Sequence, residues 1–384
     1  MKNMNVLQIL LAALLVLSCA PANPSGTVTP EPQEEPQKSV NLVVSAPGHV
    51  SIMENVRINV SGNEGSEVSI DWGDGASDKG QLQVFEHKYA SAGNYTVTAT
   101  CESTIKKDTV TVGNLLALSE AVPALVAEGK IWVMAHRAHT SDSSIPENSI
   151  SAVNAAIAAG ADVLETDTHI TSDGVVVICH DQKVNATTDK KGDITEMTLK
   201  EIKACRLKDR KGRVTDERMP TLEEYLLAAR DRAYVNLDYS PRTASAEQVM
   251  EVVERLGMVQ QVFMYCNEAS KVEEVLLLNP DANVYSKHSC YQALPKVPNR
   301  YMIQARWYID AEQTVEYAEG TAEAVKAGCV STANMLYVLD KNIPEYSVNT
   351  TYLNSLLKTF PDCHMIQNDC PDLLVPLLKK MGRR

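Results

Sequence analysis

The fold is decided by the segment Ala161-Asp-Val-Leu-Glu-Thr-Asp-Thr-His-Ile-Thr-Ser-Asp-Gly-Val-Val-Val-Ile-Cys-His-Asp181, which predicts a hairpin. On its first strand, Glu165 and Asp167 stand two residues apart and therefore point to the same side. Asp173-Gly174 is a strong signal for a two-residue turn with positive φ. Counting back from that turn pairs Asp167 with His180, and directly opposed residues share a face. We therefore expect Glu165, Asp167 and His180 to converge on one metal-sized spot, an arrangement that a slip of one residue would break.

The hairpin belongs to an alternating series of strands and helices that begins near residue 114. Helix signals occur over 150–159, ended by Gly160, and over 221–230, started by Pro220. Eight strands over roughly 270 residues favour a TIM barrel, whose usual size is ~250 residues. A doubly wound open sheet is the alternative. The returning strand 175–178 is not one of the eight, because its connection is too short for a parallel crossover, so it must lie antiparallel above the barrel mouth. The eight strands are expected to begin near Ile131, Asp162, Tyr234, Val262, Asn283, Tyr301, Cys329 and His364.

The composition bounds the class of protein. The chain has 384 residues, enough for more than one core, and a net charge of −13 with a pI near 5.2. This charge argues against a surface that binds nucleic acid or anionic membranes. Eight of the nine cysteines lie beyond Cys19 and form no CxxC pair, so we expect buried free thiols and no zinc site. A disulfide between Cys363 and Cys370 is an alternative that spacing alone does not establish.

The first 39 residues are expected to precede the folded part. Residues 1–19 combine an apolar run over 6–17, too short to span a bilayer, with the ending Val16-Leu-Ser-Cys19. This ending resembles a bacterial lipobox. It implies lipidation of Cys19 and an exported protein anchored to a bacterial membrane, on the periplasmic side or at the cell surface. An ordinary secretory signal is the alternative. Residues 20–39, rich in Pro, Glu, Ser and Thr, predict a flexible linker.

Residues 40–113 predict a β-sandwich, because short alternating stretches are separated there by turn residues. Asp71-Trp-Gly-Asp-Gly75, followed by His87-Lys-Tyr-Ala-Ser-Ala-Gly-Asn-Tyr-Thr-Val97, resembles the PKD (polycystic-kidney-disease-type) modules. The resemblance implies a spacer or a module that binds polysaccharide or protein. Asp71 and Asp74 suggest calcium or, as the simpler interpretation, turn formation.

Polar residues gather at the predicted carboxyl ends of the barrel strands, where the active sites of TIM barrels form. His136 closes the first strand, Glu165 and Asp167 lie on the second, Asp238 falls late in the third, and the hairpin adds His180. Three carboxylates suit a hard cation such as Ca²⁺ or Mg²⁺. Two histidines beside it suit general acid–base chemistry.

Taken singly, each of these residues has a simpler interpretation. A strand-end histidine is more often only a hydrogen-bonded polar residue. Arg137, beside His136, offers a fork for a phosphate group, but an isolated arginine is more often a surface charge. The agreement of five residues on one face favours a functional site.

The motifs then identify a family resemblance that covers about residues 130–384. In order and spacing they resemble the glycerophosphodiester phosphodiesterase family, and the last one resembles its closing motif. The resemblance implies a TIM barrel, here residues 114–384, with a small insertion over the mouth at about residues 182–218. The motifs are His136-Arg-Ala138, Ile145-Pro-Glu-Asn-Ser149, Gly160-Ala-Asp-Val-Leu-Glu-Thr-Asp167, Thr171-Ser-Asp-Gly174, His180-Asp181, Met219-Pro-Thr-Leu-Glu-Glu224 and Ile366-Gln-Asn-Asp-Cys-Pro-Asp372.

The resemblance also assigns roles. It implies that Arg137 binds the substrate phosphate, that Glu147 supports the site near the metal, and that His136 and His180 are the acid–base histidines. The implied metal ligands are Glu165, Asp167 and Asp238. In the implied reaction, a substrate hydroxyl attacks its own phosphorus, one histidine takes the hydroxyl proton and the other protonates the leaving alcohol. The cyclic phosphate then opens with water to glycerol phosphate.

Four positions depart from the family pattern. Ala138 stands where glycine is usual, Asp238 replaces a glutamate, Ser240 replaces a phosphate-facing lysine, and Ala186 stands where an arginine is common. Arg242 is a candidate substitute for the lysine. The favoured function is an enzyme that hydrolyses small-molecule glycerophosphodiesters with a divalent metal. The alternatives are a phospholipase-like relative that stops at a cyclic product, and a weakened barrel that acts as a binding or scaffold protein.

Overall fold

The computed structural model describes residues 41–239, 244–293, 302–304, 307–309, 315–317, 321–336 and 347–384. Cys19 with the predicted signal segment, the predicted linker 20–39, Ser240 and Arg242 lie outside these residues. Among the helices of the described part, none has both the length and the apolar character needed to cross a membrane.

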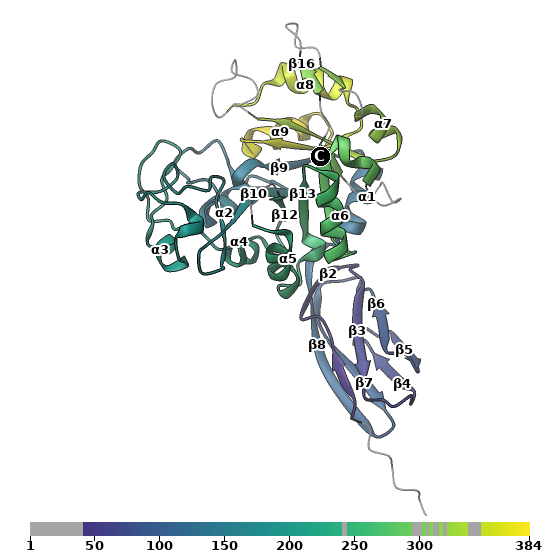
Figure 1. Cartoon of the computed structure of the whole chain (residues 1–384). Coiled ribbons are helices and arrows are strands. Elements are labelled where there is room, and N and C mark those ends of the chain that lie inside the picture. Colours follow the sequence, from purple (N-terminus) through teal and green to yellow (C-terminus); the bar gives the residue numbers. More distant parts are fainter. Residues whose placement is uncertain are drawn as a thin grey trace, which may run out of the picture. The chain divides into compact units, whose positions relative to one another are not determined.

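Eight parallel strands close into a barrel (Figure 1). β9 pairs with both β19 and β10, so the sheet returns on itself. This closure confirms the TIM barrel and excludes the doubly wound sheet, which would leave two free edges. Every strand begins within one residue of its expected start. The strands are β9 (Trp132–Ala135), β10 (Val163–Ile170), β12 (Tyr234–Tyr239), β13 (Val262–Cys266), β14 (Asn283–Lys287), β15 (Met302–Gln304), β18 (Val330–Met335) and β19 (Cys363–Asn368).

Helices on the outside of the barrel bury the outward apolar side chains of the strands. The two helices expected from sequence are present as α2 (Ile150–Ala158) and α4 (Leu222–Ala229). Ser149 caps α2, and Thr221 with Glu224 forms a capping box on α4. The others are α5 (Ala246–Arg255), α6 (Ala269–Leu278), α7 (Thr321–Lys326), α8 (Thr350–Thr359) and α9 (Pro371–Lys380).

The lower interior of the barrel is apolar. Helix α1 (Leu118–Glu128) packs Leu118, Val122 and Leu125 against inward side chains from all eight barrel strands. The polar side chains at the other end of the barrel therefore lie above an apolar layer, which keeps the local dielectric constant low.

The hairpin differs from its predicted register by one residue. β10 pairs antiparallel with β11 (Val176–Ile178), with Thr168 opposite Ile178, and the Cys179 N–H donates to the Asp167 carbonyl (3.1 Å). Asp167 therefore lies opposite Cys179 and not His180. The loop has three residues, closed by Thr171 and Val175 and ending in Gly174 with φ 83°. A three-residue loop with a left-handed glycine last is the alternative that the Asp-Gly signal also permits.

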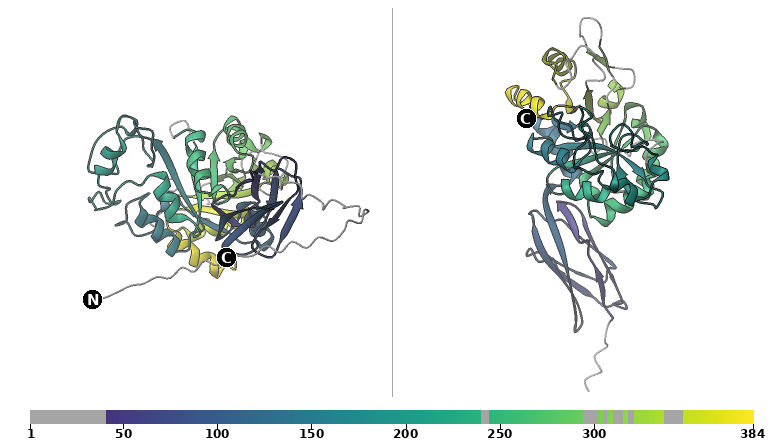
Figure 2. Two further views of the ribbon diagram at one scale, coloured as in Figure 1. Left: turned by 90° about the horizontal axis from the view of Figure 1, so that it is seen from below. Right: turned by 90° about the vertical axis from the view of Figure 1, so that its left-hand side faces the viewer.

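The insertion between β11 and α4 has a small core of its own. It contains the 3₁₀ turn η2 (Ile194–Glu196) and the helix α3 (Leu199–Ala204). Val184, Ile194, Ile202 and Leu207 pack on Val177, Cys179 and Met219, which ties the insertion to the hairpin. In Figures 1 and 2 this segment projects on the side of the barrel near α2 and α4.

The N-terminal strands form a sandwich of a three-stranded and a five-stranded sheet around an apolar core that includes Trp72. Asp71 and Asp74 accept hydrogen bonds from the Gly73 and Ala76 N–H groups, and Asp74 also binds His87 (2.7 Å). Their role as turn formers matches the simpler interpretation. The strands are β1 (Val43–Ser45), β2 (His49–Ile52), β3 (Val56–Ser61), β4 (Val68–Asp71), β5 (Ser77–Gly80), β6 (Val84–His87), β7 (Gly93–Cys101) and β8 (Thr104–Leu116).

Candidate active site

The predicted acid–base and metal-binding residues line one pocket of about 170 Å³ at the carboxyl ends of the barrel strands. A larger hollow of about 880 Å³, between the insertion and α4, contains none of them. The small pocket is the candidate active site because both histidines and carboxylates line it. They are His136, Glu165, Asp167, His180, Asn236, Asp238, Tyr265, Tyr285, Gln304, Asn334, Leu336 and Gln367.

The three carboxylates come from neighbouring strands. In the parallel register of β10 and β12, Asp167 lies beside Asp238, and Glu165 lies beside Asn236. Glu165 and Asp167 are 7% and 1% exposed, so two carboxyl side chains are held away from bulk water. The buried Oδ1 of Asn236 has no hydrogen-bond partner among the described residues. This oxygen-rich donor set fits a hard divalent cation.

His180 reaches the pocket despite the shifted register. β11 ends at Ile178, so the strand parity that would turn His180 away no longer applies at residue 180. Its Nδ1 lies 2.7 Å from Asp181 Oδ1, and its backbone carbonyl lies 3.3 Å from Nε2 of the buried His169. The predicted convergence therefore holds, but for a different geometric reason.

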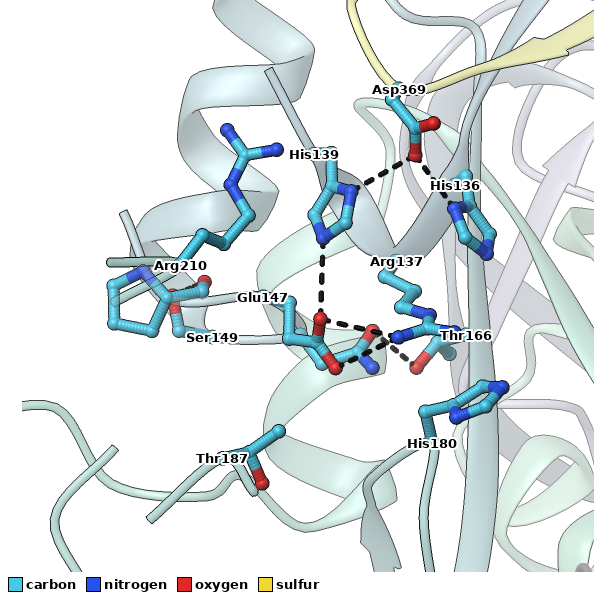
Figure 3. Close-up of polar contacts among 12 residues, drawn as sticks. His136, Arg137, His139, Glu147, Ser149, Thr166, His180, Thr187, Arg210 and Asp369 are labelled. Atoms are coloured by element: carbon cyan, nitrogen blue, oxygen red, sulfur yellow. Dashed lines mark hydrogen bonds and ion pairs between the residues drawn. The ribbon is translucent and has the colours of Figure 1, made fainter. Parts of the chain in front are cut away.

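His136 faces the pocket from the end of β9 and is held by Asp369, which follows β19. His136 Nδ1 lies 2.7 Å from Asp369 Oδ1 (Figure 3), which leaves Nε2 for the pocket. Burial lowers the pKa of His136, but the hydrogen bond to Asp369 and the charge of Glu165 outweigh it and raise that pKa. The pKa of Asp369 is lowered far below its usual range, because its bonds to His136 and His139 outweigh burial.

Arg137 and Glu147 lie beside the pocket and bind each other. Arg137 Nη1 is 3.3 Å from both carboxylate oxygens of Glu147. Neither side chain is among the pocket-lining residues. Burial raises the pKa of Glu147, but His139 and Arg137 together lower it to about 2. The phosphate-binding role of Arg137 stays a prediction.

A left-handed turn directly after β9 determines where the Arg137 side chain lies. Arg137 and Ala138 both have positive φ, 49° and 53°, where alanine is disfavoured and glycine is not. The Arg137 N–H donates to Glu165 Oε2 (2.9 Å), and the Ala138 methyl is buried in the main core. The turn thus accommodates the extra methyl group at the position where the family usually has glycine.

Sequence reasoning missed several residues of the site. Two of them are His139 and Asp369. Together with His136 they form a cluster, within the described part, whose possible metal-ligand atoms lie within 4.8 Å of one another. The three predicted carboxylates share the pocket without forming such a close cluster. Two signals were available: Asn236 shares strand parity with Asp238, and Asp369 stands inside the closing motif.

Ala186 is exposed on the insertion.

The fold and pocket define a TIM-barrel protein with a buried site of histidines and carboxylates at the carboxyl ends of its strands. The chain belongs to the glycerophosphoryl diester phosphodiesterase family, whose model matches residues 136–344. A PKD domain matches residues 39–113.

Individual relatives agree with this placement. The chain is 37% identical over 111 residues to a glycerophosphodiester phosphodiesterase of Caldanaerobacter subterraneus, a match that covers 28% of this chain and 45% of that protein. It is 34% identical over 110 residues to mouse glycerophosphodiester phosphodiesterase 1, covering 27% of this chain and 32% of the mouse protein. The chain thus spans less than half the length of these curated relatives. The crystal structure of a glycerophosphoryl diester phosphodiesterase from Parabacteroides distasonis has the same fold, with a TM-score of 0.56, 18% identity and coverage of 68% of this chain and 92% of that one.

Proposed function

We propose that this protein hydrolyses glycerophosphodiesters to glycerol 3-phosphate and an alcohol. The observation that carries the proposal is the presence of His136 and His180 in one pocket with three carboxylates, in a chain of this family. Two histidines in one pocket can exchange protons with opposite ends of a single substrate.

The two histidines differ in their partners, which suggests their roles. The Asp369 carboxylate at Nδ1 favours the protonated form of His136, which would donate its proton to the leaving alcohol oxygen as the P–O bond breaks. His180, held by Asp181 at Nδ1, takes the proton of the substrate hydroxyl as its oxygen bonds to phosphorus. The product of this step is a cyclic phosphate. The roles then reverse: His136 takes a proton from water, and His180 returns one to the ring oxygen as the ring opens.

Glu165, Asp167 and Asp238 are the residues that would hold a divalent cation, Ca²⁺ or Mg²⁺. When bound, the cation would offset the negative charge that develops on the phosphoryl oxygens. This chain's own contribution is to keep the three carboxylates close to the histidines and out of bulk water.

The second candidate is a phosphodiesterase that releases a cyclic phosphate as its product. The observation that favours it is the pairing of the Arg137 guanidinium with Glu147. That group faces Glu147, and Ala186 supplies no charge where the family often has arginine. With less positive charge near the phosphate, the transition state for opening the cyclic phosphate would be stabilised less. The ring-opening step would then slow. The cyclic phosphate would then accumulate.

The test uses protein lacking residues 1–19 and a panel of glycerophosphodiesters with Ca²⁺ or Mg²⁺. We expect release of glycerol 3-phosphate, its loss in EDTA, and a decrease of about 10²- to 10⁴-fold for His180→Ala. His87→Ala, which changes a histidine of the sandwich, is the matched control and should retain activity. Full activity in excess EDTA would refute the metal assignment. A persistent cyclic phosphate would identify the second candidate, and no turnover with metal bound would favour the scaffold alternative.

A further inference from the structure

We propose that His139 is a positioning residue for this site, which holds the Asp369 carboxylate in place against Nδ1 of His136. The inference rests on the proposed function, because it concerns the acid–base role of His136. His139 is distinct from the catalytic pair, since it does not line the pocket.

The contacts form one continuous chain of polar side chains. Asp369 Oδ1 lies 2.7 Å from His136 Nδ1 and 3.1 Å from His139 Nδ1, so a single oxygen serves both rings (Figure 3). On its other side, His139 Nε2 lies 3.4 Å from Glu147 Oε2, an ion-pair distance. Glu147 in turn faces Arg137. His139 thus bridges the two carboxylates, with Nδ1 toward Asp369 and Nε2 toward Glu147.

The backbone explains why His139 can reach Asp369. The left-handed turn at Arg137 and Ala138 folds the chain back, so the His139 N–H donates to the His136 carbonyl (2.9 Å). The two rings are then edge to face, with centroids 5.6 Å apart. His139 is 10% exposed, so its ring is held by packing and is not free to swing into water.

This geometry gives the Asp369 carboxylate two imidazole partners. Asp369 orients His136 so that Nε2 faces the pocket, and a buried carboxylate is fixed more tightly by two hydrogen bonds than by one. Without His139, Asp369 loses one of the hydrogen bonds that fix its orientation and can shift relative to His136. Displacement of a reacting group by about 1 Å can cost about 10²-fold in rate. The expected defect is therefore in kcat, with little change in KM.

Three substitutions separate the two arms of His139. Asn places an amide nitrogen where Nδ1 stands, so His139→Asn keeps the donor to Asp369. Gln places one where Nε2 stands, so His139→Gln keeps only the contact to Glu147. His139→Ala removes both. We expect kcat to fall about 10- to 100-fold for His139→Ala and His139→Gln, and to recover most of that loss in His139→Asn. KM should stay close to that of the wild type, and all three variants should remain folded at the assay temperature.

Two results would overturn the inference: unchanged kcat in His139→Ala, or equal losses of kcat in the Asn and Gln variants. A readout without turnover keeps it testable if the proposed function fails, that is, if wild-type protein cleaves no diester. Nitrogen-15 spectra of the histidine rings report whether His136 Nδ1 carries a proton. That signal should be sharp and single in the wild type and in His139→Asn, and altered in His139→Ala and His139→Gln. The same spectrum in all four proteins would refute the role of His139 independently of any activity.

Discussion

At the scale of single residues, Asp369 is the group whose charge the site depends on most. Its lowered pKa means that its contribution to stability is present above the unfolded value of about 3.9 and is lost as the pH falls further. The raised pKa of His136 means that its contribution is present below about 6.5 and is lost as the pH rises through the folded value. Asp369→Asn should therefore lower the unfolding temperature most between about pH 4 and 6.5.

The measurement is thermal unfolding from pH 3 to 9, together with an NMR titration of His136. In Asp369→Asn the pKa of His136 should fall, because its partner carboxylate is gone. The matched control is Asp372→Asn, three residues further on, whose carboxylate accepts hydrogen bonds from the Ser141 N–H and hydroxyl. That variant should leave the pKa of His136 unchanged. A loss of stability in Asp369→Asn that is equal at every pH would contradict the assignment.

The residue scale is also where sequence reasoning fell short. His136 was found because it closes a strand, and Glu165 because it alternates with Asp167. His139 and Asp369 could not be joined in the same way, since they are separated by 230 positions. Their contact depends on β9 and β19 being neighbours, which only closure of the barrel provides. Local periodicity carries no information on such a contact.

At the scale of elements, the hairpin of β10 and β11 depends on the backbone of Gly174. This residue has φ 83°, and a Cβ added there would meet nothing within 4 Å. Gly174→Ala should therefore cost only backbone strain, about 1 kcal/mol. For a domain of this size, that lowers the unfolding temperature by roughly 2–4 °C. Calorimetry measures the shift directly.

Gly174→Asn is the matched variant, because asparagine tolerates the left-handed region better than alanine. It should recover part of the loss. If both variants were as stable as the wild type, the left-handed conformation of Gly174 would be wrong. The Asp-Gly pair indicates a hairpin but does not fix its length, because Asp173 also binds the Leu199 N–H of the insertion (2.9 Å).

At the scale of the whole molecule, the order of strands and helices could be predicted because each element carries its own periodicity. The eight barrel strands begin within one residue of their expected positions. Strand count and chain length favoured closure but left the doubly wound sheet open, and the pairing of β9 with β19 and β10 decided between them. The pairing of charged side chains in the site depends on which residues meet across the barrel. Sequence periodicity does not predict these contacts, and only the motifs indicate them.

The eight cysteines of the described part offer a test that spans the sandwich, the insertion and the barrel. All eight are buried free thiols, and burial raises the pKa of Cys179, Cys266 and Cys363 to about 12. A disulfide between Cys363 and Cys370 is not formed. Cys363–Asn368 is a continuous strand, whose six residues carry the chain about 16 Å away from Cys363, and a disulfide needs Cα atoms within about 7 Å.

A thiol reagent at pH 8 should therefore label almost none of these cysteines in folded protein lacking residues 1–19, since thiolates are the reactive form. In denaturant it should label all eight. The unfolding temperature should not depend on added reductant, because no described cysteine is bonded to another. A count of six in denaturant without reductant, rising to eight with it, would reveal a disulfide. Tryptic mapping would then show whether Cys363 and Cys370 form it and whether the end of β19 differs from the strand described here.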